Sequence, residues 1–315
     1  MRILFVYHDY FKRRKRYGYI LHSLGHSVKY VDVLSKTQGK PVELRHLEDV
    51  DFVLAINSAY AHFGILSEEF FAECAAKNIP VACYSTCLCE KTIRQTVKIA
   101  KPFSWVFEHT PQVVRLMKEA DPKYAEKYHV LPHGFHPEQF FPNDLPKRYD
   151  VSFGGHPQQR NMKRREMLAA ACDQFDVTVF GKALCQRLGR PKREYRTTTQ
   201  ERQIYNHSRV CLNLPFYDST QGFLRAINAP NDRFFETSAC GSIQLTGWDD
   251  DLAQMLEPDK ECFYYKNTQD MLGLLDMILD NYERLCHVGE RARIRCMTDH
   301  TYRHRIERMM RIVRG

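Results

Sequence analysis

The stretch NDRFFETSACG (231–241), continued by SIQLTG (242–247), decides the fold that we predict for this chain. A loop rich in Gly, Asn and Pro precedes it (216–230), so the chain enters a helix near Asn231, stops that helix at Gly241 and continues as a buried strand. The first N–H groups of such a helix lack backbone partners, and with the helix dipole they favour a phosphate. The stretch therefore predicts an α/β domain that binds a phosphate-containing ligand.

The same alternation of strand and helix extends on both sides of this stretch. Further strands are expected at 149–155, 175–181, 209–215 and 261–265, with helices at about 160–174, 199–207 and 251–256. Short apolar strands that alternate with helices predict a parallel sheet covered by helices on both faces. We therefore expect a Rossmann-like domain over residues 148–298.

The first part of the chain shows an independent copy of this pattern. Strands are expected at 2–7, 27–33, 51–57, 79–85, 104–110 and 128–134, and helices at 14–24, 67–77 and 111–119. Ser67 is a candidate N-cap, and Gly25 a candidate C-cap. A Pro- and Gly-punctuated segment (132–142) then forms a linker. Two Rossmann-like domains, 1–135 and 148–298, would leave a ligand cleft between the carboxyl ends of their strands.

The amino-acid composition of the chain limits the classes of protein to which it can belong. Of the 315 residues 43% are hydrophobic, but no run of about 18 apolar residues predicts a membrane span. MRILFVYHDY (1–10) lacks the order of a signal peptide, so we expect a cytoplasmic protein whose 11 cysteines are mostly buried thiols. Cys83, Cys87 and Cys89 lie close together, but no second pair at zinc-site spacing follows, which disfavours a metal. The net charge of +8 favours anionic partners: nucleotide phosphates, anionic lipid heads or nucleic acid.

Two charged residues of the deciding helix could hold a nucleotide. Arg233 could add a charge-assisted contact to a phosphate. Glu236 falls in the second turn, where a carboxylate can accept hydrogen bonds from a diol such as a ribose. The alternative is that Arg233 and Glu236 form an ordinary ion pair, three residues apart, on the helix surface.

A second candidate loop follows the strand at 149–155. Gly154 and Gly155 end that strand and precede a basic helix that contains Arg164. Glycines let a backbone approach a ligand closely, and a cation on the helix could meet its phosphates. Lys182, after the glycine that ends the next strand, is a further phosphate candidate. A tight turn and a plain surface lysine are the alternatives.

The first domain should hold the acceptor of any transfer reaction. An inverting transfer needs a general base, and the candidates at strand ends are His8, Asp9, Glu108 and His109. Loop polarity or helix capping explains each of them equally well. The basic run 12–16 could draw in an anionic acceptor or a membrane surface, although a solvated helix face is the simpler interpretation.

The order of motifs in the second half resembles one protein family. These motifs are the LNLP strand (Cys211–Pro215), Arg233–Gly241, Ile243–Thr246, 261–279, 289–295 and 300–305. Together they resemble the C-terminal domain of GT-B glycosyltransferases of the family 1/4-like group, nearest to the spore maturation protein (CgeB) type. The likeness covers 149–315 well and the first half only in outline.

The resemblance implies an α/β fold of the GT-B type, with two Rossmann-like domains that face each other across a cleft. It implies that Glu236 binds the donor ribose and that Asn231, Asp232, Arg233 and Phe234 form the helix start beside the pyrophosphate. It supports a role for the Gly154–Gly155 loop and Arg164. It also implies that no cofactor or metal is required and that a last helix (299–315) packs back on the first domain.

One position departs from the family pattern. Retaining family 4 enzymes have a further glutamate eight residues before the ribose-binding one, and here that position is Asn228. An amide cannot supply the same negative charge, so either stereochemical outcome stays open.

These expectations lead to a glycosyltransferase that moves a sugar from a nucleoside diphosphate sugar, with UDP favoured, to an unidentified acceptor hydroxyl. Two alternatives remain: a sugar transferase that modifies nucleic acid, suggested by the charge, and a catalytically silent nucleotide-sugar-binding protein, suggested by Asn228.

Overall fold

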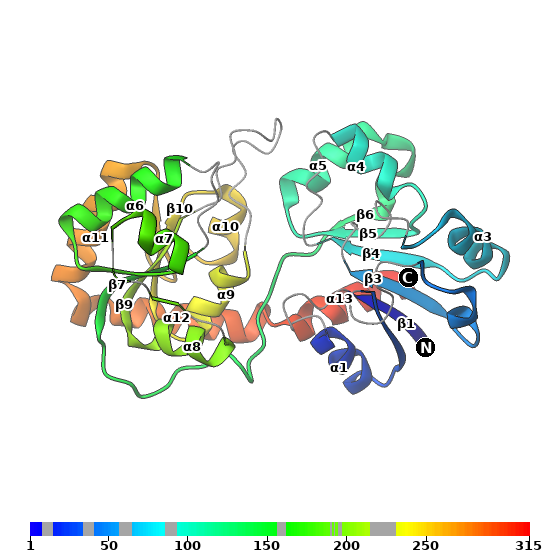
Figure 1. Cartoon of the computed structure of the whole chain (residues 1–315), viewed down its shortest axis with the longest axis horizontal. Helices are drawn as coiled ribbons and strands as arrows, with labels where there is room; N and C mark the ends of the chain where they lie inside the picture. Colours follow the sequence, from blue (N-terminus) through cyan, green and yellow to red (C-terminus); the bar gives the residue numbers. More distant parts are fainter. Residues whose placement is uncertain are drawn as a thin grey trace. The chain divides into compact units, whose positions relative to one another are not determined.

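The computed structural model describes most of the chain. Its described residues are 1–7, 15–33, 41–56, 65–85, 93–155, 162–189, 191, 193–194, 197–214 and 231–315. They form two compact units, Met1–Pro132 with Tyr302–Gly315 and His133–Thr301, and each is built around one sheet (Figure 1).

The first unit contains a six-stranded parallel sheet in the order β2-β1-β3-β4-β5-β6. Its strands are β1 (Arg2–Tyr7), β2 (Ser27–Asp32), β3 (Phe52–Ile56), β4 (Val81–Ser85), β5 (Trp105–Glu108) and β6 (Tyr128–Val130). The central strands β3 and β4 are buried along their whole length, as expected for a parallel sheet covered on both faces.

Helices from both ends of the chain cover this sheet. They are α1 (Lys15–Ser23), α3 (Glu68–Ala76), α4 (Ile93–Ala100), α5 (Pro111–Ala120) and α13 (Tyr302–Arg314), with the 3-10 turns η1 (Leu44–Leu47) and η2 (Pro122–Lys127). The last helix, α13, contributes Tyr302, Ile306 and Met309 to the same core as Phe5 and Leu54. The end of the chain is thus an integral part of the first unit.

The second unit contains a five-stranded parallel sheet in the order β11-β10-β9-β7-β8. Its strands are β7 (Tyr149–Gly154), β8 (Val177–Phe180), β9 (Ser208–Asn213), β10 (Ile243–Gly247) and β11 (Phe263–Tyr265). Alternate residues of β9 serve opposite faces: Val210 and Leu212 belong to one core cluster and Cys211 to the other.

The helices of this unit divide between the two faces of the sheet (Figure 1). They are α6 (Met162–Gln174), α7 (Lys182–Arg187), α8 (Thr198–His207), α9 (Asp232–Ala239), α10 (Asp250–Met255), α11 (Thr268–Asp280) and α12 (Tyr282–Asp299). Apolar residues of α6 and α11 join the cluster of Val210, whereas those of α8 and α9 join the cluster of Cys211.

Gly241 stops α9, as the sequence predicts, and also lets another helix approach. Its φ of 74° lies in the left-handed region that favours glycine. A Cβ on Gly289 of α12 would lie 2.3 Å from the carbonyl oxygen of Gly241. Helix α12 therefore packs against the end of α9 through two glycines, and this contact was not foreseen from the sequence.

The predicted α/β class, with two parallel Rossmann-like sheets, is confirmed. Ser67 caps α3 through a hydrogen bond from the Phe70 N–H (3.1 Å), also as predicted. The short helices α4 and α7 were not anticipated. Within the described part of the chain, no helix combines the length and the apolar character that a membrane span needs.

Candidate active site

The second unit gathers several predicted residues at one edge of its sheet. Strands β7, β8, β9 and β10 run parallel, so their carboxyl ends meet at a single edge, where ligands bind in open α/β sheets. Helix α9 begins at this edge, between β9 and β10. We call the group Gly155, Arg164, Gly181, Arg233 and Glu236 with the start of α9 the α9 edge.

Asn231 fixes the start of α9. Its side-chain oxygen accepts a hydrogen bond from the Phe234 N–H (3.0 Å), which satisfies one of the donors left open at a helix start. Its amide also pairs with Asn213 at the end of β9, donating to the Asn213 side-chain oxygen at 3.2 Å. Asn213 was not singled out from the sequence, although its place at a strand end signals such a role. Residues 231–233 remain only half-buried.

Two guanidinium groups flank one aromatic ring at this edge. The guanidinium carbon of Arg164 lies 5.0 Å from the centre of the Phe153 ring, and that of Arg233 lies 5.9 Å from the same centre. Arg164 comes from α6, Arg233 from α9 and Phe153 from β7. Both cations are thereby held beside the end of β7 by attraction to the ring. The structure brings together two predicted phosphate ligands that lie far apart in the sequence.

Glycines allow the ends of β7 and β8 to approach each other. Gly155 donates its N–H to the Phe180 carbonyl (3.0 Å), and Gly154 lies opposite Phe180 in the ladder. Gly181 has a φ of 132°, and a Cβ there would lie 2.1 Å from the Gly155 carbonyl oxygen. Lys182 follows directly as the first residue of α7, and its side chain lies outside the described part of the structure.

Asp232 and Phe234 have neighbours that were not expected. The Asp232 carboxylate lies 3.1 Å from Nδ1 of His133 in the linker, so a linker residue contacts the start of α9. The Phe234 side chain is fully buried in the core and packs edge-on against Phe235. Phe234 therefore supports α9 from within, and its N–H already serves the Asn231 cap.

Glu236 is a buried acidic residue in the second turn of α9. Only 2% of its surface is exposed, and Thr237 beside it is fully buried. Removing a carboxylate from water is costly unless hydrogen-bonding partners compensate. Burial, together with Cys211 and the Glu236 carboxylate, raises the pKa of the Cys240 thiol well above its usual range. Glu236 is thus a buried carboxylate one turn behind Arg233.

The first unit carries a different arrangement at the carboxyl ends of β4 and β5. Glu108 is 1% exposed, and its Oε1 lies 2.6 Å from Nδ1 of His109. The same oxygen accepts a hydrogen bond from the Thr110 N–H (3.2 Å). Ser85, the partner of Glu108 in the ladder, is also buried. We call Ser85, Glu108, His109 and Thr110 the β5 edge.

A carboxylate bound to one imidazole nitrogen fixes the orientation and the tautomer of the ring. It leaves the other nitrogen as the one that can exchange a proton with a ligand. Of the four predicted base candidates, the structure therefore joins two, Glu108 and His109, into a pair.

Several predicted residues lie outside the described part of the chain. They are the base candidates His8 and Asp9, most of the basic run 12–16, and Asn228, which stands where the retaining family 4 enzymes have a glutamate. Cys87 and Cys89 lie outside it too, whereas Cys83 is buried in β4. Among the described residues, no group of three or more His, Cys, Asp or Glu side chains is arranged to hold a metal ion.

Comparison with known proteins agrees with the second unit's architecture. Residues 160–311 match a family model described as "Glycosyl transferase-like". This matched segment contains every residue of the α9 edge except Gly155. No curated protein sequence matches the chain significantly.

Many solved structures match the fold, including the following three. Sucrose-phosphate synthase from Thermosynechococcus elongatus matches with a TM-score of 0.69 at 11% identity, covering 100% of this chain and 98% of that one. Anabaena HepE in complex with UDP and glucose matches at 0.69 and 12%, covering 100% of both chains. A glycosyltransferase from Rickettsia africae matches at 0.70 and 12%, covering 99% and 97%. At 11–12% identity these structures show the fold that the chain shares with them, and the glycosyl transferase-like family match concerns residues 160–311.

Proposed function

We propose that this protein transfers a sugar from a nucleoside diphosphate sugar, with a UDP-sugar favoured, to the hydroxyl of an acceptor. The observation that carries the proposal is the α9 edge, where Arg164 and Arg233 flank Phe153 beside the start of α9. Positive charge and the dipole of a helix start both favour a diphosphate, and this edge places two guanidinium groups beside the start of α9. Anabaena HepE, which has the same fold, was solved with UDP and glucose.

Each residue of the α9 edge has a proposed role. Arg233, Arg164 and the Gly154–Gly155 backbone bind the diphosphate, with Lys182 as a further ligand. Glu236, a buried carboxylate in the second turn of α9, accepts hydrogen bonds from the ribose hydroxyls. The leaving diphosphate is stabilised by guanidinium groups and the helix dipole, so the reaction requires no bound metal.

The β5 edge supplies the proposed base. His109 accepts the proton of the acceptor hydroxyl as the new glycosidic bond forms, and Glu108 holds the imidazole in the correct tautomer and offsets its new charge. A base of this kind belongs to an inverting transfer, in which the acceptor oxygen attacks the anomeric carbon as the diphosphate leaves. The two units thus have separate tasks: the second binds the donor and the first deprotonates the acceptor.

We place the reaction in the cytoplasm. Seven cysteines that the structure describes are free thiols, and all but Cys286 are buried: Cys74, Cys83, Cys185, Cys211, Cys240, Cys262 and Cys286. Free thiols in this number fit a reducing compartment.

The direct test is a donor screen with the full chain. Purified protein is incubated with UDP- and GDP-sugars, with and without mixtures of acceptor hydroxyl compounds, and release of UDP or GDP is measured in the presence and absence of EDTA. The proposal expects UDP release that an acceptor accelerates and EDTA does not abolish. UDP binding without turnover of any donor would instead make the protein a silent binding module. Salt-sensitive binding to unrelated duplex DNA without UDP binding would favour the nucleic-acid alternative.

A further inference from the structure

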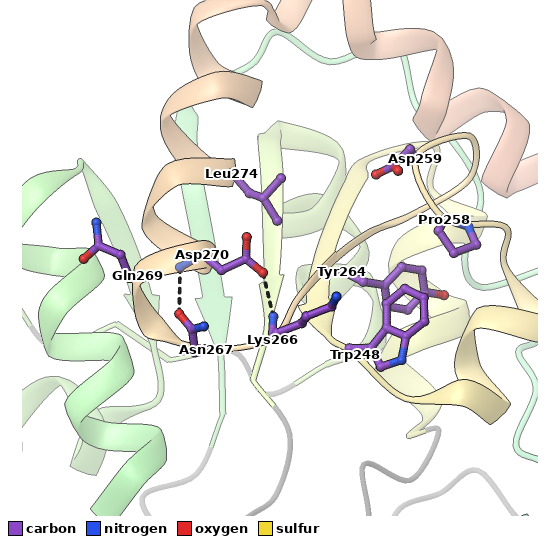
Figure 2. Close-up of a pocket in the computed structure, with 9 residues that line it drawn as sticks. All are labelled: Trp248, Pro258, Asp259, Tyr264, Lys266, Asn267, Gln269, Asp270 and Leu274. Atoms are coloured by element: carbon purple, nitrogen blue, oxygen red, sulfur yellow. Dashed lines mark hydrogen bonds between the residues drawn. The ribbon is translucent and has the colours of Figure 1, made fainter.

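A separate pocket of about 610 Å³ lies in the second unit, at the carboxyl ends of β10 and β11 (Figure 2). Trp248 follows β10, Lys266 follows β11, and the Trp248 N–H donates to the Tyr265 carbonyl at 2.8 Å. Asn267 and Asp270, at the start of α11, form its other side. The pocket is therefore built on strands and a helix that contribute no residue to the α9 edge.

Trp248 presents an apolar ring face to this pocket. Its side chain is 43% exposed, and its indole N–H already donates to Asp250 (3.0 Å). The Tyr264 ring supports it edge-on, with the centres 5.6 Å apart. The Tyr264 hydroxyl points inward and donates to the carbonyls of Leu252 and Leu256 (3.0 and 2.8 Å). The indole N–H of Trp248 and the hydroxyl of Tyr264 thus already have hydrogen-bond partners within the protein. The two rings can therefore make only apolar contacts with a ligand.

The charges around the ring disfavour two kinds of ligand, a second cation on the ring face and an anion. Lys266 Nζ lies 5.8 Å from the centre of the Trp248 ring, so a cation that sought the same ring would meet a like charge. Asp259 and Asp270 line the same pocket, so an anion would meet two carboxylates and a single lysine. Asp270 also occupies the first turn of α11, where its Oδ2 accepts the Lys266 N–H (2.8 Å), and this offsets the attraction of that helix start for anions. A neutral ligand meets neither of these repulsions.

We propose that this pocket binds a neutral sugar ring. One face of a pyranose carries mainly C–H groups, which fit the exposed face of Trp248. Its rim carries hydroxyls, which can donate to the carboxylates of Asp259 and Asp270 and accept from the Lys266 ammonium. The sugar belongs to an oligosaccharide acceptor and is anchored away from the reacting hydroxyl. This acceptor role rests on the proposed function, whereas saccharide binding itself does not.

The binding test uses the fluorescence of Trp248 in the full chain. The sequence contains two tryptophans, so the Trp105→Phe variant leaves Trp248 as the single reporter. Maltose, cellobiose, lactose and diacetylchitobiose are titrated in the millimolar range, with glucuronate and choline as charged controls. The proposal expects a saturable change with at least one neutral disaccharide and none with glucuronate or choline. Saturation by a charged control, or by no disaccharide, would overturn it.

Three variants show where the sugar is held, with calorimetry replacing fluorescence because one of them removes the reporter. Trp248→Ala should weaken disaccharide binding by roughly tenfold or more. Asp259→Asn should weaken disaccharide binding less. Asparagine, like aspartate, tolerates the positive φ of 62° at this position, so the backbone should be unchanged. Tyr124→Ala, which removes an exposed ring from the first unit, should leave disaccharide binding unchanged. Equal affinities in all three would contradict the proposal.

A UDP titration separates this inference from the proposed function. Trp248→Ala should bind UDP and UDP-glucose as the unchanged protein does. If it lost affinity for UDP-glucose but not for UDP, the pocket would be part of the donor site and the inference would fail. Absence of UDP binding in the unchanged protein would instead refute the proposed function and leave the saccharide pocket standing.

Discussion

The α9 edge and the β5 edge lie at the carboxyl ends of two similar parallel sheets, yet we propose different tasks for them. The α9 edge assembles residues from β7, α6 and α9, and its cations are held beside an aromatic ring. The β5 edge consists of neighbours in the chain, Glu108 to Thr110, with one carboxylate removed from water. The first arrangement suits binding of a charged group, and the second suits control of a proton. One fold thus supports both roles through the side chains at its strand ends.

The largest expected effect is on kcat, and it comes from substitutions at the β5 edge that should not change UDP affinity. His109→Ala should lower kcat by about 100- to 10,000-fold, because general base catalysis contributes that much, while UDP affinity stays unchanged. Glu108→Gln should lower kcat less, since it keeps the shape but weakens the hold on the imidazole. UDP release assays with the acceptor found by screening measure the rate, and calorimetry measures the affinity.

His22→Ala is the matched control, because His22 lies on the exposed face of α1 in the same unit. It should retain full activity. If His109→Ala kept full activity as well, the β5 edge would not be the site of proton transfer.

The second largest expected effect is on UDP affinity, and it comes from a substitution at the α9 edge. Arg233→Met should weaken UDP binding by about 10- to 100-fold, because a charge-assisted hydrogen bond contributes about 1.5–3 kcal/mol. Arg293→Met, on the exposed part of α12, is its control and should bind UDP normally. Calorimetric titration measures both. Equal UDP affinities for the two variants would show that Arg233 does not bind the donor. The proposed difference in function between the α9 edge and the β5 edge would then be wrong.

Two glycines of the second unit allow a matched test of backbone constraint. Gly181→Ala should destabilise the protein by several kcal/mol, because a Cβ would lie 2.1 Å from the Gly155 carbonyl at a φ of 132°. Gly273→Ala, in α11 with nothing within 4 Å, should stabilise it by about 1 kcal/mol. Denaturant unfolding measures both. A neutral Gly181→Ala would show that the ends of β7 and β8 do not need this close approach.

The smallest effect concerns the opposite end of the first sheet. Arg2 contacts Asp51 at 2.6 Å and holds the pKa of that carboxyl at about 2. Because the folded-state pKa is lowered, this stabilisation is present above the ordinary carboxyl pKa and is lost as pH falls toward 2. Asp51→Asn should therefore lower Tm slightly at pH 7 and by less near pH 3, without any change in kcat. A change in kcat would mean that activity is not confined to the carboxyl edges.

Much of the architecture could be predicted from the sequence because its signals are local. Short apolar runs bounded by Gly and polar residues indicated every strand of both sheets, and Gly241 marked the end of α9 through its need for a positive φ. The start of α9 near Asn231 was predicted from the Gly-, Asn- and Pro-rich stretch 216–230 that precedes it in the sequence. Helices α4 and α7 were missed because neither has a strong boundary signal.

The candidate site could be predicted only in part, because its contacts join distant segments. Arg164 and Arg233 were named separately, but nothing in the sequence indicated that both lie beside Phe153. The pairing of Asn213 with Asn231 depends in the same way on β9 and α9 being neighbours. Glu108 and His109 are adjacent in sequence, yet only the fold shows that their side chains meet and that the carboxylate is buried.

We propose that a nucleoside diphosphate binds at the start of α9, and a crystal structure of the protein with UDP would show whether it does. We expect diphosphate density beside Arg233 and the first N–H groups of α9, with a ribose hydroxyl within hydrogen-bonding distance of Glu236. UDP bound elsewhere, with the start of α9 covered by protein, would contradict it.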